Sequence, residues 1–337
     1  MVRRSSSAGA GLQAHSLQAH SLGAALGLLV DRLVGEPPPA VHPVARFGQG
    51  MMAVEGRWWR DDRAAGVRYA ATGVGVGVAA GVTVRALAPP VVATAVATTV
   101  AVGGRALGEA AMTVADALRS GDLDGARAAL PALVGRDPEQ LDEKEIARAV
   151  VESVAENTAD AIVAPAVWAT LAGPVGVCAH RAANTLDAMV GYRSPRYDRF
   201  GWAAARIDDV MAWPGARLTA VLVALVRPGQ AMAVWRVVRR HSGAHPSPNA
   251  GVSEAAFAAA LGLRLGGENR YGDRVELRAT LGDGRPPEPS DIERAVRLQR
   301  DVTTALAGLL AAPMLARWLG AARWWLVEAG PQGGRRR

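Results

Sequence analysis

The chain has 337 residues, half of them hydrophobic, and its net charge of +7 is carried almost entirely by arginine, since Lys144 is the only lysine. Nucleic-acid-binding proteins gather Arg and Lys into a patch with stacking aromatics. Here the arginines are scattered among acidic residues, so we expect no nucleic-acid partner. The single cysteine, Cys178, excludes an intrachain disulfide and a cysteine-based zinc cluster.

The N-terminal segment 1–21 contains a serine run and the near-repeat AHSLQAHSL, and it carries little that could pack, so we predict that it is disordered. The apolar stretch at 22–34 is short and contains Asp31 and Arg32, which makes it a poor membrane-spanning helix. No small-residue cleavage site follows it before GEPPPAVHP, which argues against a cleaved signal peptide.

Apolar runs rich in Ala, Val, Leu and Gly come next, and each nears the roughly 20 residues that cross a bilayer. They lie at 69–84, 86–104, 161–179, 210–226 and 302–327. This composition is typical of helices packed through small residues. We therefore predict an all-α fold: a polytopic helical membrane protein with four or five spans and polar helical connections, in the bacterial cell membrane. The integral-membrane domain is expected at 22–330, followed by a basic tail at 331–337.

The first two runs are separated by Arg85 and broken by Pro89-Pro90, which indicates a helical hairpin, or one span with a re-entrant piece. The pattern Gly73-Val-Gly75-Val-Gly77 offers close-packing surfaces. A β-strand interpretation of this Val-Gly alternation is the less favoured alternative.

Two polar stretches connect the runs. The first, 109–156, has helix-period apolar positions and is predicted to form soluble helices; the second, 227–300, is assigned to the cytoplasm by the positive-inside preference. Polar residues crowd against the ends of the apolar runs. Because an unpaired charge in hydrocarbon costs several kcal/mol, such residues usually face a protein-lined cavity and mark function.

The densest cluster is ESVAENTADAIVAP, in which Glu152, Glu156 and Asp160 recur every four residues and share one helix face. Together with Asn157 they offer the hard oxygen ligands that suit Mg²⁺. A solvated acidic face is the alternative. Since the acidic stripe runs into an apolar segment, the chemistry alone favours neither interpretation.

A second cluster follows the third apolar run. Asn184 and Asp187 lie three residues apart on one helix face, and arginines and aspartates follow in the loop and the next helix: Arg193, Arg196, Arg199, Arg206, Asp208 and Asp209. Guanidinium groups suit bidentate binding of phosphate or carboxylate, so we predict an anion site. For any single arginine, contact with lipid headgroups is the better interpretation.

The third cluster is SPNAGVSEAAFAAALGLRLGGENRYGD, in which Asn249 precedes a helix carrying Glu254, and Asn269 follows in a glycine-rich turn. These groups could hold a phosphate or an amide, although helix-start and helix-stop signals explain most of the pattern. His42, in VHPVAR, is a candidate ligand or acid/base, but a histidine before proline is more often structural.

Taken together, these motifs resemble the adenosylcobinamide-phosphate synthase family of cobalamin biosynthesis, the CobD/CbiB family. The resemblance begins at LLVDRLVGEPPPAVHPVARFG and continues through VAENTADAIVAP, RAANTLDAMVGYRSPRYDRFGWAAARIDDVMAWPGARLTA and SPNAGVSEAAFAAALGLRLGGENRYG. The chain departs from the family pattern at Glu36, Ala159, Ala161 and Asp273. None of these changes removes a carboxylate or amide from the clusters.

The resemblance implies an ATP-dependent acid–amine ligase. It would join (R)-1-aminopropan-2-ol, or its O-phosphate, to the free propionate of adenosylcobyric acid, giving adenosylcobinamide or its phosphate. A carboxylate does not react with an amine unaided, so ATP and Mg²⁺ are the implied cofactors. The implied partners are the corrinoid, the amino alcohol, the lipid bilayer and other membrane-associated cobalamin-assembly enzymes.

The resemblance and the residue chemistry together imply roles for individual residues. The catalytic residues would be Glu152, Glu156, Asp160 and Asp187, of which Glu156, Asp160 and Asp187 would hold metal. The substrate-binding residues would be His42, Asn157, Asn184, Arg193, Arg206, Asp208, Asp209, Asn249, Glu254, Asn269 and Tyr271.

Two other classes of protein fit part of the pattern. A corrinoid or small-molecule membrane transporter would also use helices broken by Pro and Gly, but transporters tend to have inverted repeats, and no matching halves are visible in the sequence. A non-catalytic scaffold of the cobalamin assembly complex would tolerate loss of the carboxylates.

Overall fold

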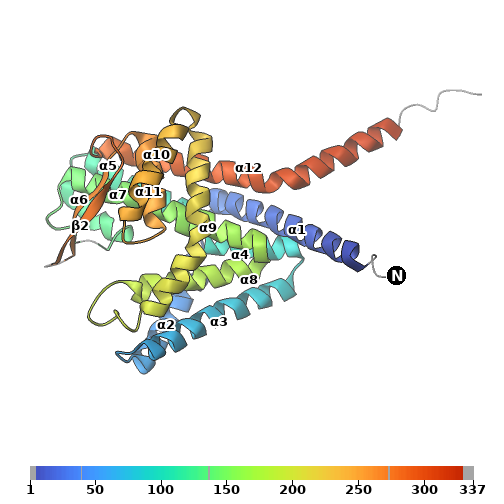
Figure 1. Ribbon diagram of the computed structural model, residues 1–337, viewed down its shortest axis with the longest axis horizontal. Coiled ribbons are helices and arrows are strands. Elements are labelled where there is room, and N and C mark those ends of the chain that lie inside the picture. The colour runs from blue at the N-terminus through green and yellow to red at the C-terminus, as the bar shows by residue number, and fades with distance from the viewer. Residues whose placement is uncertain (1–4, 39, 136, 272–273, 329–337) are drawn as a thin grey trace, which may run out of the picture.

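The computed structural model describes residues 5–38, 40–135, 137–271 and 274–328, with side chains at 15–38, 40–135, 137–268 and 277–316. Helices make up most of this part of the chain (Figure 1). In chain order they are α1 (Ser5–Val34), α2 (Pro43–Trp58), α3 (Arg63–Leu87), α4 (Pro90–Ala101), α5 (Gly104–Arg119), α6 (Leu123–Ala129), η1 (Leu130–Ala132), α7 (Glu143–Thr158), η2 (Ala159–Val163), α8 (Ala164–Leu186), η3 (Asp187–Gly191), α9 (Trp202–Val226), η4 (Pro228–Gln230), α10 (Ala231–His241), η5 (Ser242–Ala244), α11 (Ala250–Leu261) and α12 (Pro289–Glu328).

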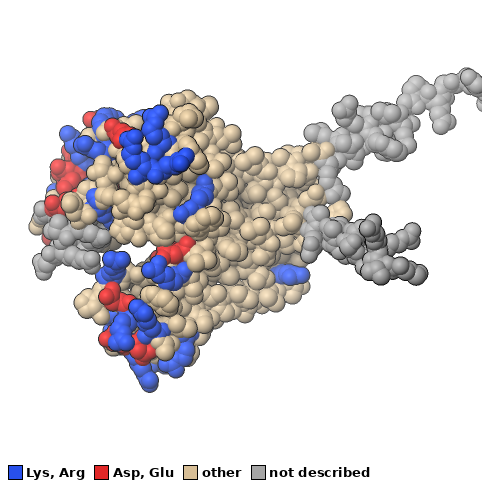
Figure 2. All heavy atoms as spheres, viewed as in Figure 1, with Lys and Arg blue, Asp and Glu red and all other residues tan. Residues whose placement is uncertain are grey.

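Four helical segments among the described residues are long and apolar enough to cross a membrane: Arg63–Leu87, Pro90–Arg119, Glu143–Gly191 and Trp202–Val226. In Figure 2 the charged side chains of the visible face gather at one end of the molecule, whereas the region where α1, α3, α4 and α8 run alongside one another is almost free of them. The protein is therefore a polytopic helical membrane protein, as the sequence predicted. The fifth run, 302–327, lies in α12 and extends beyond the described side chains.

Small residues let the apolar helices approach closely. A Cβ at Gly73 would lie 2.6 Å from Leu186 Cδ1, and one at Gly77 would lie 2.7 Å from the Cβ of Ala182 on α8. Gly75 has nothing within 4 Å, so the stripe that packs against α8 has the helical period of four residues. The β-strand interpretation of this segment is wrong, because all of it lies in α3.

The N-terminal segment is helical where the structure describes it. The sequence predicted that residues 1–21 are disordered; residues 5–21 belong to α1, which packs against α4, α8 and α12, and residues 1–4 lie outside the described residues. The Ser21 hydroxyl donates to the Leu310 carbonyl at 2.7 Å. Gly27 fits against Thr98 of α4 so closely that a Cβ there would lie 2.5 Å from Thr98 Cβ. The packing partner that the sequence did not reveal is α4, which buries one face of α1.

The polar connection at 109–156 forms the end of α5, then α6, η1 and most of α7, so the predicted helices are confirmed. They were predicted to be soluble, whereas both ends of this stretch belong to segments that are long and apolar enough to cross a membrane. The start of α7 is fixed by a capping box, in which Asp142 accepts from the Glu145 amide at 2.8 Å and Glu145 accepts from the Asp142 amide at 3.0 Å. Apolar faces of α5, α7, α11 and α12 form the largest core, with Ile146 and Phe257 fully buried. This core lies at the charged end of the molecule (Figures 1 and 2).

A two-stranded antiparallel hairpin is added to this helical fold. Strand β1 (Leu265–Tyr271) pairs with β2 (Arg274–Leu281), with Leu265 opposite Leu281. Both of these leucines are fully buried and join the largest core. The hairpin covers part of the segment that the sequence assigned to a polar connection.

The helical segment Glu143–Gly191 is continuous but irregular. Two π-helical turns, η2 and η3, lie at the two ends of α8. The helix is kinked at Gly173, which has a φ of 60° and precedes Pro174. A π turn holds an extra residue and is frequent at functional sites. Each π turn carries an aspartate: Asp160 in η2 and Asp187 in η3.

Candidate functional site

Carboxylates from four elements, α7, η2, η3 and α9, meet where α9 lies across the two π turns. Helix α9 contacts both η2 and η3, and Figure 1 shows it crossing α8. Asp160 lies within electrostatic range of Glu156, Asp187 and Asp208. We call these four residues the acidic cluster. The sequence placed Glu156 and Asp160 on one helix face; the fold brings the other two aspartates to them.

One oxygen in the acidic cluster has no protein partner. Asp160 Oδ1 is buried and accepts no hydrogen bond from any described residue. Asp208 is 8% exposed, and its Oδ1 accepts from Asn184 Nδ2 at 3.3 Å. Buried polar atoms normally have a partner, so the bare oxygen points to a ligand that would supply one.

Arg181 supplies the positive charge at this site, and the sequence reasoning missed it. Its Nη1 donates to Asn184 Oδ1 at 3.4 Å, and it lies within electrostatic range of Asp160 and Glu36. Its Nε is buried and has no hydrogen-bond partner in the described part of the chain. The signal was its place directly before AANTLD, within one turn of Asn184.

The opening motif reaches the site through Glu36. His42 Nε2 lies 3.2 Å from Glu36 Oε2, while His42 Nδ1 accepts from the Val44 amide at 3.2 Å and caps α2. His42 therefore has the structural role that was its alternative, and it also holds the carboxylate that faces Arg181.

Glu152 lies outside the acidic cluster and fastens the hairpin to α7. It is 3% exposed, and its Oε1 accepts from the Gly266 amide at 2.7 Å. Arg148, one turn earlier, donates to the Gly266 carbonyl and, at 2.6 Å, to the Glu268 carbonyl. Asn157 also bonds within its own helix, since its Nδ2 donates to the Ser153 carbonyl at 3.0 Å.

Asn249 and its neighbours join α11 to α9. Asn249 Oδ1 accepts from Arg217 Nη1 at 2.6 Å, and its Nδ2 donates to the Asp209 carbonyl at 2.8 Å. The Asp209 carboxylate pairs with Arg206 at 3.0 Å. Further along α11, Glu254 is buried with its Oε1 3.6 Å from His245 Nε2. Both ends of the Asn249 amide are thus used inside the protein.

The loop arginines pair with acids near α2. Arg196 donates to Glu55 Oε1 at 3.0 Å and stacks over Trp59 at 4.6 Å, and Arg199 lies 3.9 Å from Asp61. Arg193 is exposed in the same loop.

Two of the predicted substrate-binding residues lie outside what the structure can place. Asn269 and Tyr271 belong to β1 by their backbone, and their side chains fall outside the described residues.

The acidic cluster fits one mode of magnesium binding and not another. Within the described ranges, no three His, Cys, Asp or Glu side chains converge as a metal cage, so Glu156, Asp160 and Asp187 do not form a complete ligand set. Mg²⁺ that is bound together with phosphates needs only one or two carboxylates and keeps several waters. The bare Oδ1 of Asp160 suits this second mode.

The fold and the site define a class: a polytopic helical membrane protein with carboxylate, amide and guanidinium groups gathered at two π turns. The chain belongs to the CobD/Cbib protein family, whose model matches residues 24–299.

Curated relatives cover nearly the whole chain. "Cobalamin biosynthesis protein CobD" of Mycobacterium tuberculosis (strain ATCC 25618 / H37Rv) is 47% identical over 310 residues, covering 90% of this chain and 98% of that protein. The protein of the same name from Pelobacter propionicus is 41% identical over 300 residues, with 84% and 92% covered, and that from Sinorhizobium sp is 37% identical over 310 residues, with 86% and 96% covered. No solved structure gives a significant match.

Proposed function

We propose that this protein is an ATP-dependent acid–amine ligase of cobalamin biosynthesis, acting in the cell membrane. It joins (R)-1-aminopropan-2-ol, or its O-phosphate, to the free propionate of adenosylcobyric acid. Family membership and the names of the curated relatives support the pathway. The observation that carries the chemistry is the half-buried acidic cluster, with the buried, bare Oδ1 of Asp160 within electrostatic range of Arg181.

Amide formation makes three demands that these side chains can meet. The carboxylate must be activated, and ATP with Mg²⁺ supplies that chemistry when bound. Asp160, with Glu156 or Asp187, would hold the metal, and the Arg181 Nε–H would bind an anionic oxygen. The attacking amine must lose its proton, which a carboxylate of the cluster can accept. Asn184 holds Asp208 in place for this role.

The position of the site suits a large polar substrate. The acidic cluster lies within two of the spanning segments, Glu143–Gly191 and Trp202–Val226. A corrin studded with amides needs a broad polar surface more than a tight apolar pocket. The multi-pass fold would hold the enzyme at the membrane where other cobalamin-assembly enzymes could meet it.

The test is product formation by purified protein. The full chain in detergent or nanodiscs is given adenosylcobyric acid, aminopropanol phosphate and Mg-ATP, and the products are identified by mass spectrometry. We expect a product carrying the aminopropanol phosphate, absent without ATP and in Asp160→Asn. The matched control is Asp61→Asn, an exposed aspartate remote from the cluster. No product from folded protein that binds the corrinoid would instead indicate transport or scaffolding.

A further inference from the structure

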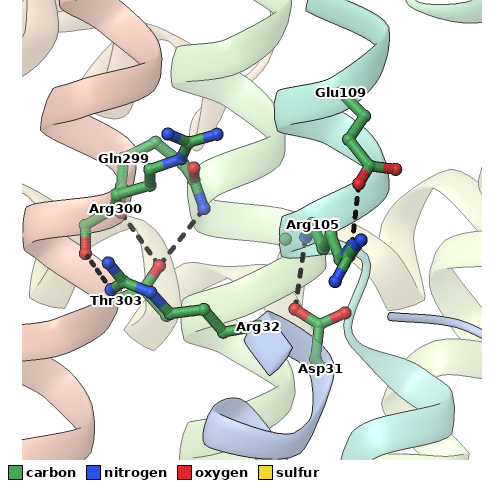
Figure 3. A pocket seen from close by; sticks show the side chains of 8 residues that line it. Asp31, Arg32, Arg105, Glu109, Gln299, Arg300 and Thr303 are labelled. Atoms are coloured by element: carbon green, nitrogen blue, oxygen red, sulfur yellow. Dashed lines mark hydrogen bonds and ion pairs between the residues drawn. The ribbon is translucent and has the colours of Figure 1, made fainter. Parts of the chain in front are cut away.

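A second polar site lies between the end of α1, the start of α5 and the middle of α12 (Figure 3). It is a cavity of about 230 Å³ lined by Asp31, Arg32, Gly104, Arg105, Glu109, Gln299, Arg300 and Thr303. Pockets for drug-sized ligands are about 300–1,000 Å³, so this cavity suits a smaller molecule. None of its residues belongs to the acidic cluster, and none was predicted as a site residue.

The floor of the cavity offers two bare acceptor oxygens. Asp31 is 2% exposed; its Oδ2 accepts from the Arg105 amide at 3.2 Å and so caps α5, but its Oδ1 has no hydrogen-bond partner among the described residues. Gln299 is 3% exposed, and its Nε2 donates to Thr303 Oγ1 at 3.3 Å. Its buried Oε1 has no hydrogen-bond partner among the described residues either. Helix capping explains one oxygen of Asp31 and leaves the other two acceptors for a ligand that donates.

A glycine lets the side chains of Asp31 and Gln299 approach the same point of α5. A Cβ at Gly104 would lie 3.0 Å from Asp31 Oδ2 and 3.3 Å from Gln299 Nε2, the two atoms of these side chains that already have partners. An ammonium group carries three donors and no acceptor, and its charge complements the Asp31 carboxylate. The floor therefore favours a primary amine over a neutral hydroxyl.

The rim of the cavity offers a cation. Arg105 is paired with Glu109 at 2.7 Å, and Arg32 donates to Thr304. The exposed Arg300 guanidinium makes no hydrogen bond or ion pair that the structure shows within the described ranges. Its Nη2 and the bare Oε1 of Gln299 lie 3.8 Å and 3.9 Å from the point that a Cβ of Gly108 would occupy. A free guanidinium pairs well with phosphate, a few atoms from the amine position.

We propose that this cavity binds a small phosphorylated amino alcohol, with its ammonium against Asp31 and Gln299 and its phosphate against Arg300. The cavity adjoins η2, the π turn that carries Asp160. A Cβ at Gly104 would lie 3.2 Å from Ile162 Cδ1, and the Gly103 amide donates to the Ala161 carbonyl at 3.2 Å. The use of the cavity as the subsite for the amine donor, in the O-phosphorylated form, rests on the proposed ligase function.

Direct binding tests the cavity without the reaction. The full chain is placed in nanodiscs of phosphatidylcholine and phosphatidylglycerol and titrated calorimetrically with O-phosphoethanolamine. We expect saturable binding at one site. Ethanolamine, which lacks the phosphate, and glycerol 3-phosphate, which lacks the ammonium, should each bind at least about tenfold more weakly than O-phosphoethanolamine. Arg300→Gln and Gln299→Leu should each weaken O-phosphoethanolamine binding by about tenfold.

The matched control is Arg297→Gln. Arg297 is also an exposed arginine of α12, but it pairs with Glu293 at 2.6 Å and does not line the cavity. Its variant should bind as the unmodified protein does. Because Arg300 is exposed and makes no contact that would be lost, Arg300→Gln should fold normally. Equal binding by Arg300→Gln and the unmodified chain, or equal affinity for glycerol 3-phosphate, would overturn the proposal.

Two further arms separate the possible sources of the ligand and the two proposals. If phosphatidylethanolamine in the nanodisc abolishes binding of O-phosphoethanolamine, a lipid headgroup is the occupant and the donor assignment fails. In the ligase assay, Arg300→Gln should raise the KM for aminopropanol phosphate about tenfold with little change in kcat. If Arg300→Gln ligates normally with an unchanged KM, the role proposed for the cavity is wrong and the ligase function stands. If O-phosphoethanolamine binds as expected but no ligation occurs, the ligase function is wrong and the binding site stands.

Discussion

The acidic cluster and the cavity beside it differ in the sign of their net charge and in how their residues are distributed along the sequence. Glu156, Asp160, Asp187 and Asp208 outnumber the positive charge of Arg181, whereas the arginines of the cavity outnumber its acids. The cluster residues all lie in motifs that carry the family resemblance, whereas among the cavity residues only Asp31 and Arg32 do. Two neighbouring sites of opposite charge can hold two differently charged reactants while their surroundings remain distinct.

The largest expected effect comes from neutralising the cluster. Asp160→Asn should reduce product formation at least about a hundredfold, because it removes the bare buried carboxylate oxygen. Its thermal unfolding temperature should stay the same or rise, since like charges repel one another in the cluster. Activity is measured by mass spectrometry of the product and stability by thermal unfolding in detergent. A matching loss of stability and activity would make Asp160 a structural residue.

Removing the positive charge of the cluster should lower stability as well as activity. Arg181→Gln leaves Asp160 and Glu36 without their cationic neighbour, and we expect a loss of about 3 kcal/mol. The double variant Arg181→Gln with Asp160→Asn should recover part of that loss, which a double-mutant cycle of unfolding free energies measures. Additive effects of the two changes would show that these groups do not interact.

A smaller effect tests whether Glu152 belongs to the cluster. Glu152→Ala leaves the half-buried Gly266 amide without its acceptor, so we expect a loss of about 1–3 kcal/mol in stability. Glu152→Gln keeps an acceptor oxygen and should retain most of both stability and activity per folded molecule. If Glu152→Gln folds normally but makes no product, the catalytic role predicted from the sequence is correct.

The smallest effect concerns Asp31, outside the four spanning segments. Burial raises the pKa of Asp31 from 3.8 to about 6. The folded state then binds this proton more tightly than the unfolded state, so the contribution of Asp31 to stability falls as pH rises from about 4 to about 6. Asp31→Asn should therefore be more stable than the unmodified chain above pH about 6, by about 1–2 kcal/mol after allowing for solvent screening.

That stability difference should shrink as pH falls toward about 4 and approach zero below the ordinary pKa of 3.8, where the unmodified carboxyl becomes protonated in both states. Thermal unfolding of the two proteins across this range measures it. A difference that does not change with pH would mean that the Asp31 charge is not disfavoured by burial.

The sequence predicted the helical membrane fold, and the shared helix face of Glu156 and Asp160, for a physical reason; Asp187 was joined to them as a metal ligand through the family resemblance, and Asp208 was assigned to substrate binding. Apolar length and small-residue composition determine spans directly, and Glu156 and Asp160 lie within one turn of each other. It could not predict that α9 crosses both π turns, which depends on packing between distant helices. Nor could it distinguish Glu152 from Asp160, because only the fold shows that the hairpin amide of Gly266 meets Glu152.

The cavity escaped the sequence reasoning altogether. Asp31 lies within the opening motif LLVDRLVGEPPPAVHPVARFG, but it was interpreted only as a charge that made its stretch a poor span, and Gln299 carried no motif. Their common neighbour is Gly104, and that proximity follows from how α1, α5 and α12 meet.

The two π turns make α8 a fixed spacer. Asp160 and Asp187 stand in η2 and η3, at either end of α8, and both turns contact α9. An α-helix turns about 100° per residue, so adding or deleting one residue between Ala164 and Leu186 would rotate Asp187 away from α9 by that angle. Helix α8 should therefore tolerate substitutions far better than insertions or deletions, which would change its length.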